Sequence, residues 1–160
     1  PLKQKVAKCL PFLQQAKLVT SPPPCDISEK VTKIVTAAGD RLTVAGDILD
    51  FKEFFVGDND FEYEEKAFGK RLEKAPESVE LLRSFREILS DATAFDAETL
   101  ETLLKGFVTE KEIKIGQIIH ALRVAVTGKG VGFGMFETLE LLGKDSCLKR
   151  IDRTLAKLST

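Results

Sequence analysis

Four polar or small residues recur at helical spacing in the mostly apolar segment 115–127: Gly116, His120, Arg123 and Thr127. This spacing places them in one narrow stripe of a helix that is apolar over most of its circumference. Burying an unpaired guanidinium is very costly. Arg123 therefore either pairs with an acid in a structural ion pair or reaches a surface, where it binds a base edge or a phosphate.

A glycine-rich loop is predicted directly after this helix, over residues 128–134. It has neither the preceding strand nor the Gly-Lys-Ser/Thr run that nucleotide-binding glycine motifs require. A loop that exposes Lys129, Phe133 and Met135 suits contact with an unstacked RNA base, because every base offers a face for stacking. The alternative is that Phe133 and Met135 pack beneath the loop.

The last predicted helix is amphipathic and begins at a capping Asp145. Its basic side chains recur every four residues at Lys149, Arg153 and Lys157, with Arg150 beside them. Such a stripe is either a solvated face or a surface along which a phosphate backbone lies.

Residues for catalysis or metal binding are scarce. His120 is the single histidine, and the three cysteines (Cys9, Cys25 and Cys147) form no CxxC pair. We therefore predict neither a catalytic site nor a metal centre, and free thiols in a reducing, cytoplasmic compartment. The acidic stretch 47–65 lacks the EF-hand spacing, and its acids are interpreted as facing water while its aromatic residues pack inward.

The charge balance restricts the possible partners. The chain has 24 Lys and Arg against 25 Asp and Glu, which argues against a generic polybasic nucleic-acid coat. Residues 105–160 hold ten basic and six acidic residues, so we expect any nucleic-acid contact in this half.

No apolar run approaches the roughly 20 residues of a membrane span. The chain begins with Pro1 and its only methionine is Met135, so we expect a piece of a longer protein.

Apolar residues recur with a helical period nearly throughout, which predicts an all-α, multihelical fold. Two helical subdomains are expected, residues 1–75 and 76–160. In the first, Pro11 is expected to divide the helical stretch 2–19, residues 21–24 form a rigid break, and Gly39 ends a helix. In the second, helices are predicted from Pro76 to about residue 92, after a capping Asp96, and over 115–127, 135–142 and 145–158.

Short blocks follow one another along the chain: LPFLQ at 10–14, GDRL at 39–42, FF at 54–55, Tyr63 with KA at 66–67, LRVAVTG at 122–128, GMFE at 134–137 and LLGK at 141–144. In this order they resemble the C-terminal region of glutamyl-tRNA synthetases, and they cover nearly the whole chain. The resemblance implies an anticodon-binding region of the class I aminoacyl-tRNA synthetase type. Residues 1–75 would form a connector on the tRNA stem side and residues 76–160 the part that recognises the anticodon.

The resemblance also implies that this chain binds tRNA while another domain of the parent enzyme carries out catalysis. The parent enzyme would attach glutamate to tRNA(Glu) with ATP and magnesium in a catalytic domain whose His-x-Gly-His and KMSKS-type motifs are missing here, so the chain itself is expected to be non-catalytic and without cofactor. We expect a monomer that binds the tRNA(Glu) anticodon and neither DNA nor a membrane. Family contacts carry over to Arg123 and to the loop positions Gly132, Phe133 and Met135.

Together with the residues singled out above, the candidate RNA contacts are Arg123, Thr127, Lys129, Gly132, Phe133, Met135, Lys149, Arg150 and Arg153. The alternative function is a helical protein–protein interaction module that does not bind RNA.

Overall fold

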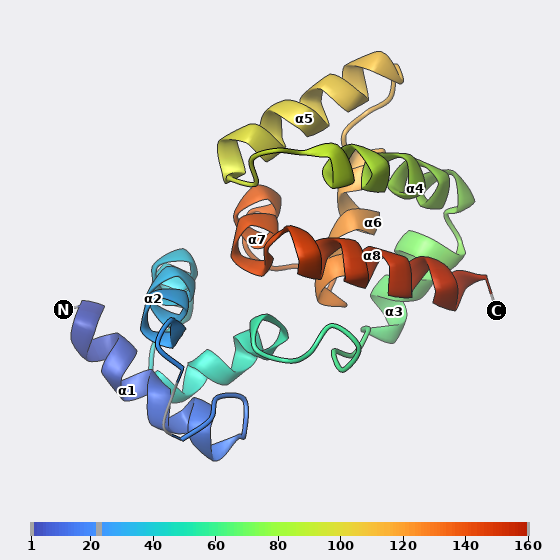
Figure 1. The fold of residues 1–160 in the computed structure, drawn as a ribbon. Helices are drawn as coiled ribbons and strands as arrows, with labels where there is room; N and C mark the ends of the chain where they lie inside the picture. The colour runs from blue at the N-terminus through green and yellow to red at the C-terminus, as the bar shows by residue number, and fades with distance from the viewer. Residues whose placement is uncertain (1, 22–23, 160) are drawn as a thin grey trace. The chain divides into compact units, whose positions relative to one another are not determined.

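The computed structural model describes residues 2–21 and 24–159. Every regular element in these ranges is helical, which confirms the predicted all-α class (Figure 1). The elements are α1 (Leu2–Gln15), α2 (Ile27–Ala38), the 3₁₀ helices η1 (Gly39–Arg41) and η2 (Ala45–Phe54), α3 (Glu65–Phe68), the π-helical turn η3 (Gly69–Glu73), α4 (Pro76–Asp91), α5 (Ala97–Glu110), α6 (Gly116–Thr127), α7 (Met135–Leu142) and α8 (Lys144–Leu158). Pro22 and Pro23 of the expected break at 21–24 lie outside the described residues.

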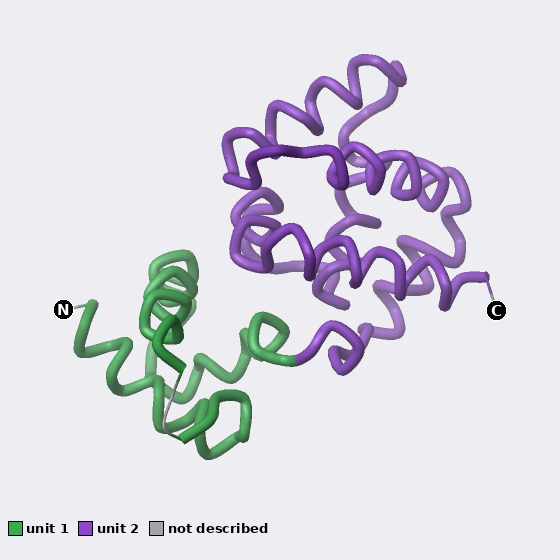
Figure 2. The backbone as a smooth tube through the Cα atoms, viewed as in Figure 1, with its two compact units in different colours: residues 1–56 green, residues 57–160 purple. Residues whose placement is uncertain are grey.

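The chain forms two compact units, residues 1–56 and 57–160 (Figure 2). The sequence places the division at 75/76, later in the chain. The difference arises because Phe68 and Leu72 are buried in the same hydrophobic core as the helices that follow them. Residues 57–75 therefore belong with the second unit.

In the first unit, α1 packs against α2 and η2. Val6, Cys9 and Leu13 form its buried face. The expected division at Pro11 is not found, because α1 continues through this residue. Proline removes one helical hydrogen bond, and burial of the apolar face offsets that loss. Gly39 ends α2 with φ of 52°, as predicted.

In the second unit, α6 lies at the centre, with α4 and α8 packed against it. Its residues from Val124 to Val126 are completely buried, as the apolar pattern predicts. The predicted cap of α5 is confirmed, since the Asp96 carboxylate accepts a hydrogen bond from the Thr99 amide at 3.1 Å. For α8, Gly143 rather than Asp145 occupies the capping position.

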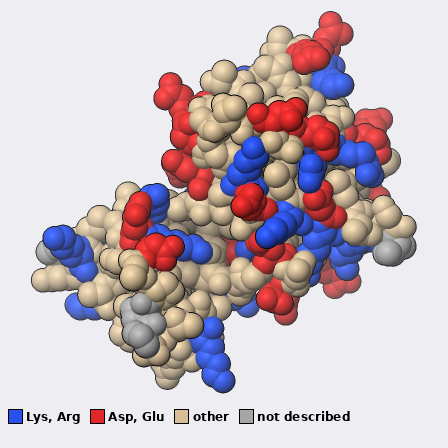
Figure 3. Space-filling view, viewed as in Figure 1, with Lys and Arg blue, Asp and Glu red and all other residues tan. Residues whose placement is uncertain are grey.

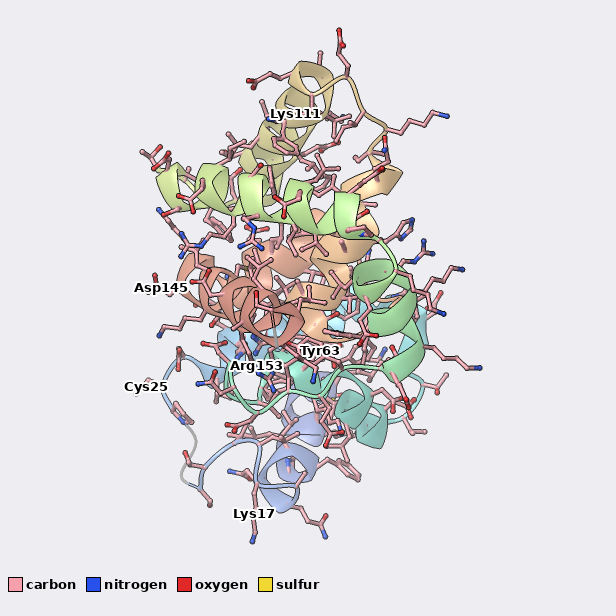
Figure 4. All side chains as sticks on the ribbon, turned by 90° about the vertical axis from the view of Figure 1, so that its right-hand side faces the viewer. Lys17, Cys25, Tyr63, Lys111, Asp145 and Arg153 are labelled. Carbon is pink, nitrogen blue, oxygen red and sulfur yellow. The ribbon has the colours of Figure 1, made fainter. Side chains whose placement is uncertain are left out.

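A non-helical segment, residues 57–64, precedes α3 and lies across α8; we call it the strap. Tyr63 and Thr154 share a hydrogen bond of 2.9 Å between their hydroxyl groups. Arg153 donates from Nη1 to the Phe61 carbonyl at 2.8 Å, and its guanidinium lies over the ring of Tyr63, beside which it is drawn in Figure 4. The strap is thus held to α8 by both backbone and side chains.

Candidate nucleic-acid interface

The Arg123 side chain connects α6 to the glycine-rich loop 128–134. It is half-buried and donates from Nη1 to the Phe133 carbonyl at 2.6 Å. A Cβ atom on Gly132 would lie 3.3 Å from the same nitrogen. The loop therefore folds back closely over the guanidinium, and its backbone holds one edge of Arg123 in place.

The loop starts in a left-handed turn. Gly128 has φ of 77°, and its amide donates to the Val124 carbonyl at 2.8 Å, so it ends α6 as glycine commonly does. Thr127 is buried and does not point at solvent. Its hydroxyl donates to the Arg123 carbonyl at 2.8 Å and accepts from the Lys129 amide at 3.1 Å. Thr127 therefore shapes the loop.

The strap holds the loop from the other side. The Glu64 amide donates to the Gly128 carbonyl at 2.7 Å, and the Gly130 amide donates to the Glu64 carboxylate at 3.2 Å. A Cβ atom on Gly130 would lie 3.3 Å from the Cβ of Ala67 in α3. The loop is thus packed against α3 as well as against α6.

The loop does not expose the side chains expected to meet a base. Phe133 is 3% and Met135 2% exposed, so the structure favours the alternative in which both pack beneath the loop. Gly132 is exposed, Lys129 is half-buried, and the exposed apolar side chain is Val131, at 80%. Val131 is not among the contacts predicted from the sequence, although its position between two glycines at the middle of the loop could have indicated it.

The basic residues of α8 divide between surface and interior. Lys149 is exposed, as expected of a solvated face. Arg153 is half-buried, and its guanidinium lies over the rings of both Phe61 and Tyr63, which also contact each other. Arg150 is only 2% exposed, so it does not lie on the surface where a phosphate contact was expected. The strap covers this part of α8. The sequence pattern of a helix alone does not show that a segment distant in sequence buries one of its faces.

Acidic residues border the C-terminal half of α8. A pocket of about 360 Å³ lies between the strap, α3 and α8, where Arg153 and Lys157 are accompanied by Asp60, Glu62, Glu65 and Glu73. On the face drawn in Figure 3, Lys and Arg side chains gather over α8 and α3 with acidic side chains among them. This region therefore has no excess of positive charge.

Three cations act on His120, which lies one turn before Arg123 in α6. Burial lowers the pKa of His120, and the positive charges of Arg71, Arg123 and Lys70 lower it further. Lys70 and Arg71 belong to η3, which packs against α6. These two residues could not be assigned to the site from the sequence, because nothing in the local pattern shows which helix faces α6.

The described residues contain neither a metal-binding cluster nor a membrane-spanning helix. Within residues 2–21 and 24–159, no group of three His, Cys, Asp or Glu side chains is placed to hold a metal ion. In the same ranges, no helix combines the length and the apolar character that crossing a membrane requires.

The sequence matches the family model of the anticodon binding domain over residues 4–155. The chain belongs to the anticodon-binding domain family. Among its relatives, the glutamate–tRNA ligase of Moorella thermoacetica is 34% identical over 144 residues, which cover 90% of this chain and 29% of that protein. That of Streptomyces griseus is 36% identical over 151 residues, covering 94% and 29%. This anticodon-binding domain thus spans less than a third of the length of these relatives.

Solved structures agree with this assignment at the level of the fold. A glutamate tRNA ligase from Elizabethkingia meningosepticum, solved in complex with its amino acid, superposes with a TM-score of 0.83 at 24% identity. The match covers 98% of this chain and 29% of that one. The fold of this chain is therefore similar to that of the matching part of this tRNA ligase.

Proposed function

We propose that this domain is the anticodon-binding part of a glutamate–tRNA ligase, and that Arg123 and the loop 128–134 contact the anticodon of tRNA(Glu). The observation that carries the proposal is the hydrogen bond from Arg123 to the Phe133 carbonyl, in a domain of the anticodon-binding family. A guanidinium held by this bond is oriented before RNA arrives. It therefore loses less conformational freedom when it binds a base.

Each group of the interface has a distinct proposed task. Arg123 binds the edge of a base, because a planar guanidinium forms two parallel hydrogen bonds to such an edge. Exposed Val131 and Gly132 offer an apolar side chain and open backbone against the face of that base. Lys129 and Lys149 contact phosphates, which positions the RNA without reading its sequence. Thr127, Phe133 and Met135 support the loop from inside.

The activity of the whole enzyme is also part of the proposal. It would attach glutamate to tRNA(Glu), and ATP and magnesium would serve a catalytic part to which none of the residues described above belongs. We propose that it works in the cytoplasm and as a monomer. The relatives named above are glutamate–tRNA ligases, which supports this proposed reaction. ATP–pyrophosphate exchange by this chain alone would contradict the non-catalytic assignment.

Binding of anticodon stem-loops tests the role of Arg123. We expect Arg123→Ala to lose about 1–3 kcal/mol of affinity for the matching anticodon and correspondingly less for a mismatched one. Arg123→Lys keeps the charge but loses the planar fork, so it should show the same loss of discrimination. Lys149→Ala, the control, should weaken both RNAs equally.

Thermal unfolding of the same variants separates recognition from folding. A large fall in melting temperature for both Arg123 variants, with unchanged discrimination between the two stem-loops, would show that Arg123 only maintains the fold. If the unsubstituted domain binds neither stem-loop at any salt concentration, that result would instead favour the protein–protein interaction module.

A further inference from the structure

We propose that Lys70 and Arg71 of η3, together with His120 of α6, form a cradle for the RNA backbone beside Arg123. The cradle would bind the phosphates that flank the base contacted by Arg123. This inference rests on the proposed RNA-binding function and adds to it a phosphate subsite on an element outside the loop.

The packing of α3 and η3 places the two cations at the loop. Ala67 lies against Gly130 of the loop. Arg71 follows Ala67 by four positions, about one turn later, and Lys70 stands directly before Arg71 in η3, which packs against α6. In the π-helical turn the Lys74 amide donates to the Gly69 carbonyl at 3.0 Å. Such turns are frequent at functional sites.

The charges of α3 and η3 are segregated between two faces. Glu65 and Glu73 line the pocket beside Arg153 and Lys157. Lys70 and Arg71 lie instead close enough to His120 to lower its pKa, as does Arg123 of the same helix. The face toward α6 is thus cationic and the face toward α8 is acidic.

Clustered cations make an anion favourable at this place. Like charges disfavour one another, and a phosphate between them relieves that repulsion. Arginine forms paired hydrogen bonds to phosphate oxygens, and lysine binds them as a point charge. Two carboxylates border the area: Glu64 accepts the Gly130 amide, and a Cβ atom on Gly134 would lie 3.8 Å from the carboxylate of Glu137. They limit the cradle to the η3 side of the loop.

A charge-matched pair of double variants tests the cradle. Lys70→Gln with Arg71→Gln removes two charges from η3. Lys105→Gln with Lys111→Gln removes two charges at α5, which packs against α4 and α7.

Fluorescence anisotropy at several salt concentrations would measure the Kd for matched and mismatched anticodon stem-loops. For the η3 variant we expect both Kd values to rise about tenfold or more, since charged hydrogen bonds are lost. The slope of log K against log salt should fall by about 1.4–1.8.

The ratio of the two Kd values should be unchanged by the η3 variant, because phosphate contacts carry no sequence information. The α5 variant should resemble the unsubstituted chain. If the two double variants bind RNA alike, the cradle is wrong, whether or not Arg123→Ala loses discrimination. If Arg123→Ala retains discrimination while the η3 variant alone weakens binding, the cradle stands and the anticodon-reading role of Arg123 fails.

The single histidine provides a second measurement that does not depend on affinity. His120 contributes the one imidazole resonance of the chain in an NMR titration. Its pKa should rise in the η3 variant, because two neighbouring positive charges are removed. It should also rise when a stem-loop is added to the unsubstituted chain, because phosphates then face the ring. An unchanged His120 pKa in saturating RNA would overturn the cradle.

Discussion

Arg150 donates from Nε to the Asp58 carboxylate at 2.9 Å across 92 positions of sequence. Its guanidinium is almost completely buried, lies over the Phe61 ring, and donates from Nη1 to the Val126 carbonyl at 2.9 Å. One side chain of α8 thereby joins the strap to the C-terminal end of α6, next to the loop that carries the proposed interface. A residue that resembles a phosphate ligand in sequence is instead an internal anchor.

Removing the acid of this pair should destabilise the domain. Asp58→Ala leaves the Arg150 charge buried without its carboxylate, and such losses cost about 3–5 kcal/mol. We expect a value near the lower end, because the Asp58 side chain is 21% exposed. Urea unfolding would measure it. Asp60→Ala, two positions along the strap at an exposed residue, is the control, and equal midpoints for the two variants would contradict the anchoring role.

Gly128 should not tolerate a side chain. Its φ of 77° is left-handed, and a Cβ atom there would collide with the Glu62 carbonyl. The backbone strain of Gly128→Ala alone is about 1–2 kcal/mol, and the collision adds to it. Gly106→Ala in α5 is the matched control: that position is helical with open space around it, so stability should rise by about 0.5–1 kcal/mol. A neutral Gly128→Ala in thermal unfolding would disprove the close contact between loop and strap.

The Asp96 cap should make stability depend on acidity. Hydrogen bonds from the Thr99 hydroxyl and amide lower the pKa of Asp96 below its usual value. Its stabilising contribution is therefore complete above the ordinary aspartate pKa and is lost as the pH falls through the lowered value of the folded state. Asp96→Ala should lower the melting temperature at pH 7, and the difference from the unsubstituted chain should shrink in acid.

A comparison with α2 provides the control for that cap. Asp26 occupies the equivalent position of α2 but makes no side-chain capping bond. Asp26→Ala should therefore lower the melting temperature less than Asp96→Ala does. The same loss for both, at every pH, would show that the cap of α5 contributes nothing specific.

The three cysteines should differ sharply in reactivity. Cys25 is exposed, whereas Cys9 and Cys147 are buried, and burial raises the pKa of Cys147 to about 12. Because the thiolate is the reactive form, a disulfide reagent at pH 8 should label Cys25 first and Cys147 only after unfolding. Denatured, unreduced protein should contain three thiols. Finding a single thiol would contradict the prediction of a reducing compartment.

The sequence alone determined the helical class and much of the local detail of α6. Apolar residues over most of the circumference of this helix predicted that it is central, with Arg123 in a polar stripe, and Leu122 and Val124 are both completely buried. Asp96 and Gly39 marked the start and the end of helices correctly, because capping depends on residues close in sequence. These features depend on residues close together in the sequence, so a short stretch of sequence is enough to predict them.

Only the tertiary structure decided which side chains reach solvent around the interface. The strap covers Arg150 and stacks Phe61 and Tyr63 against α8, and the loop packs Phe133 and Met135 inward. The packing of η3 on α6 brings Arg71 beside His120, although 49 positions separate them. Burial and charge at these positions depend on contacts between segments distant in sequence. A helical period indicates that a face is covered, but not which distant segment covers it.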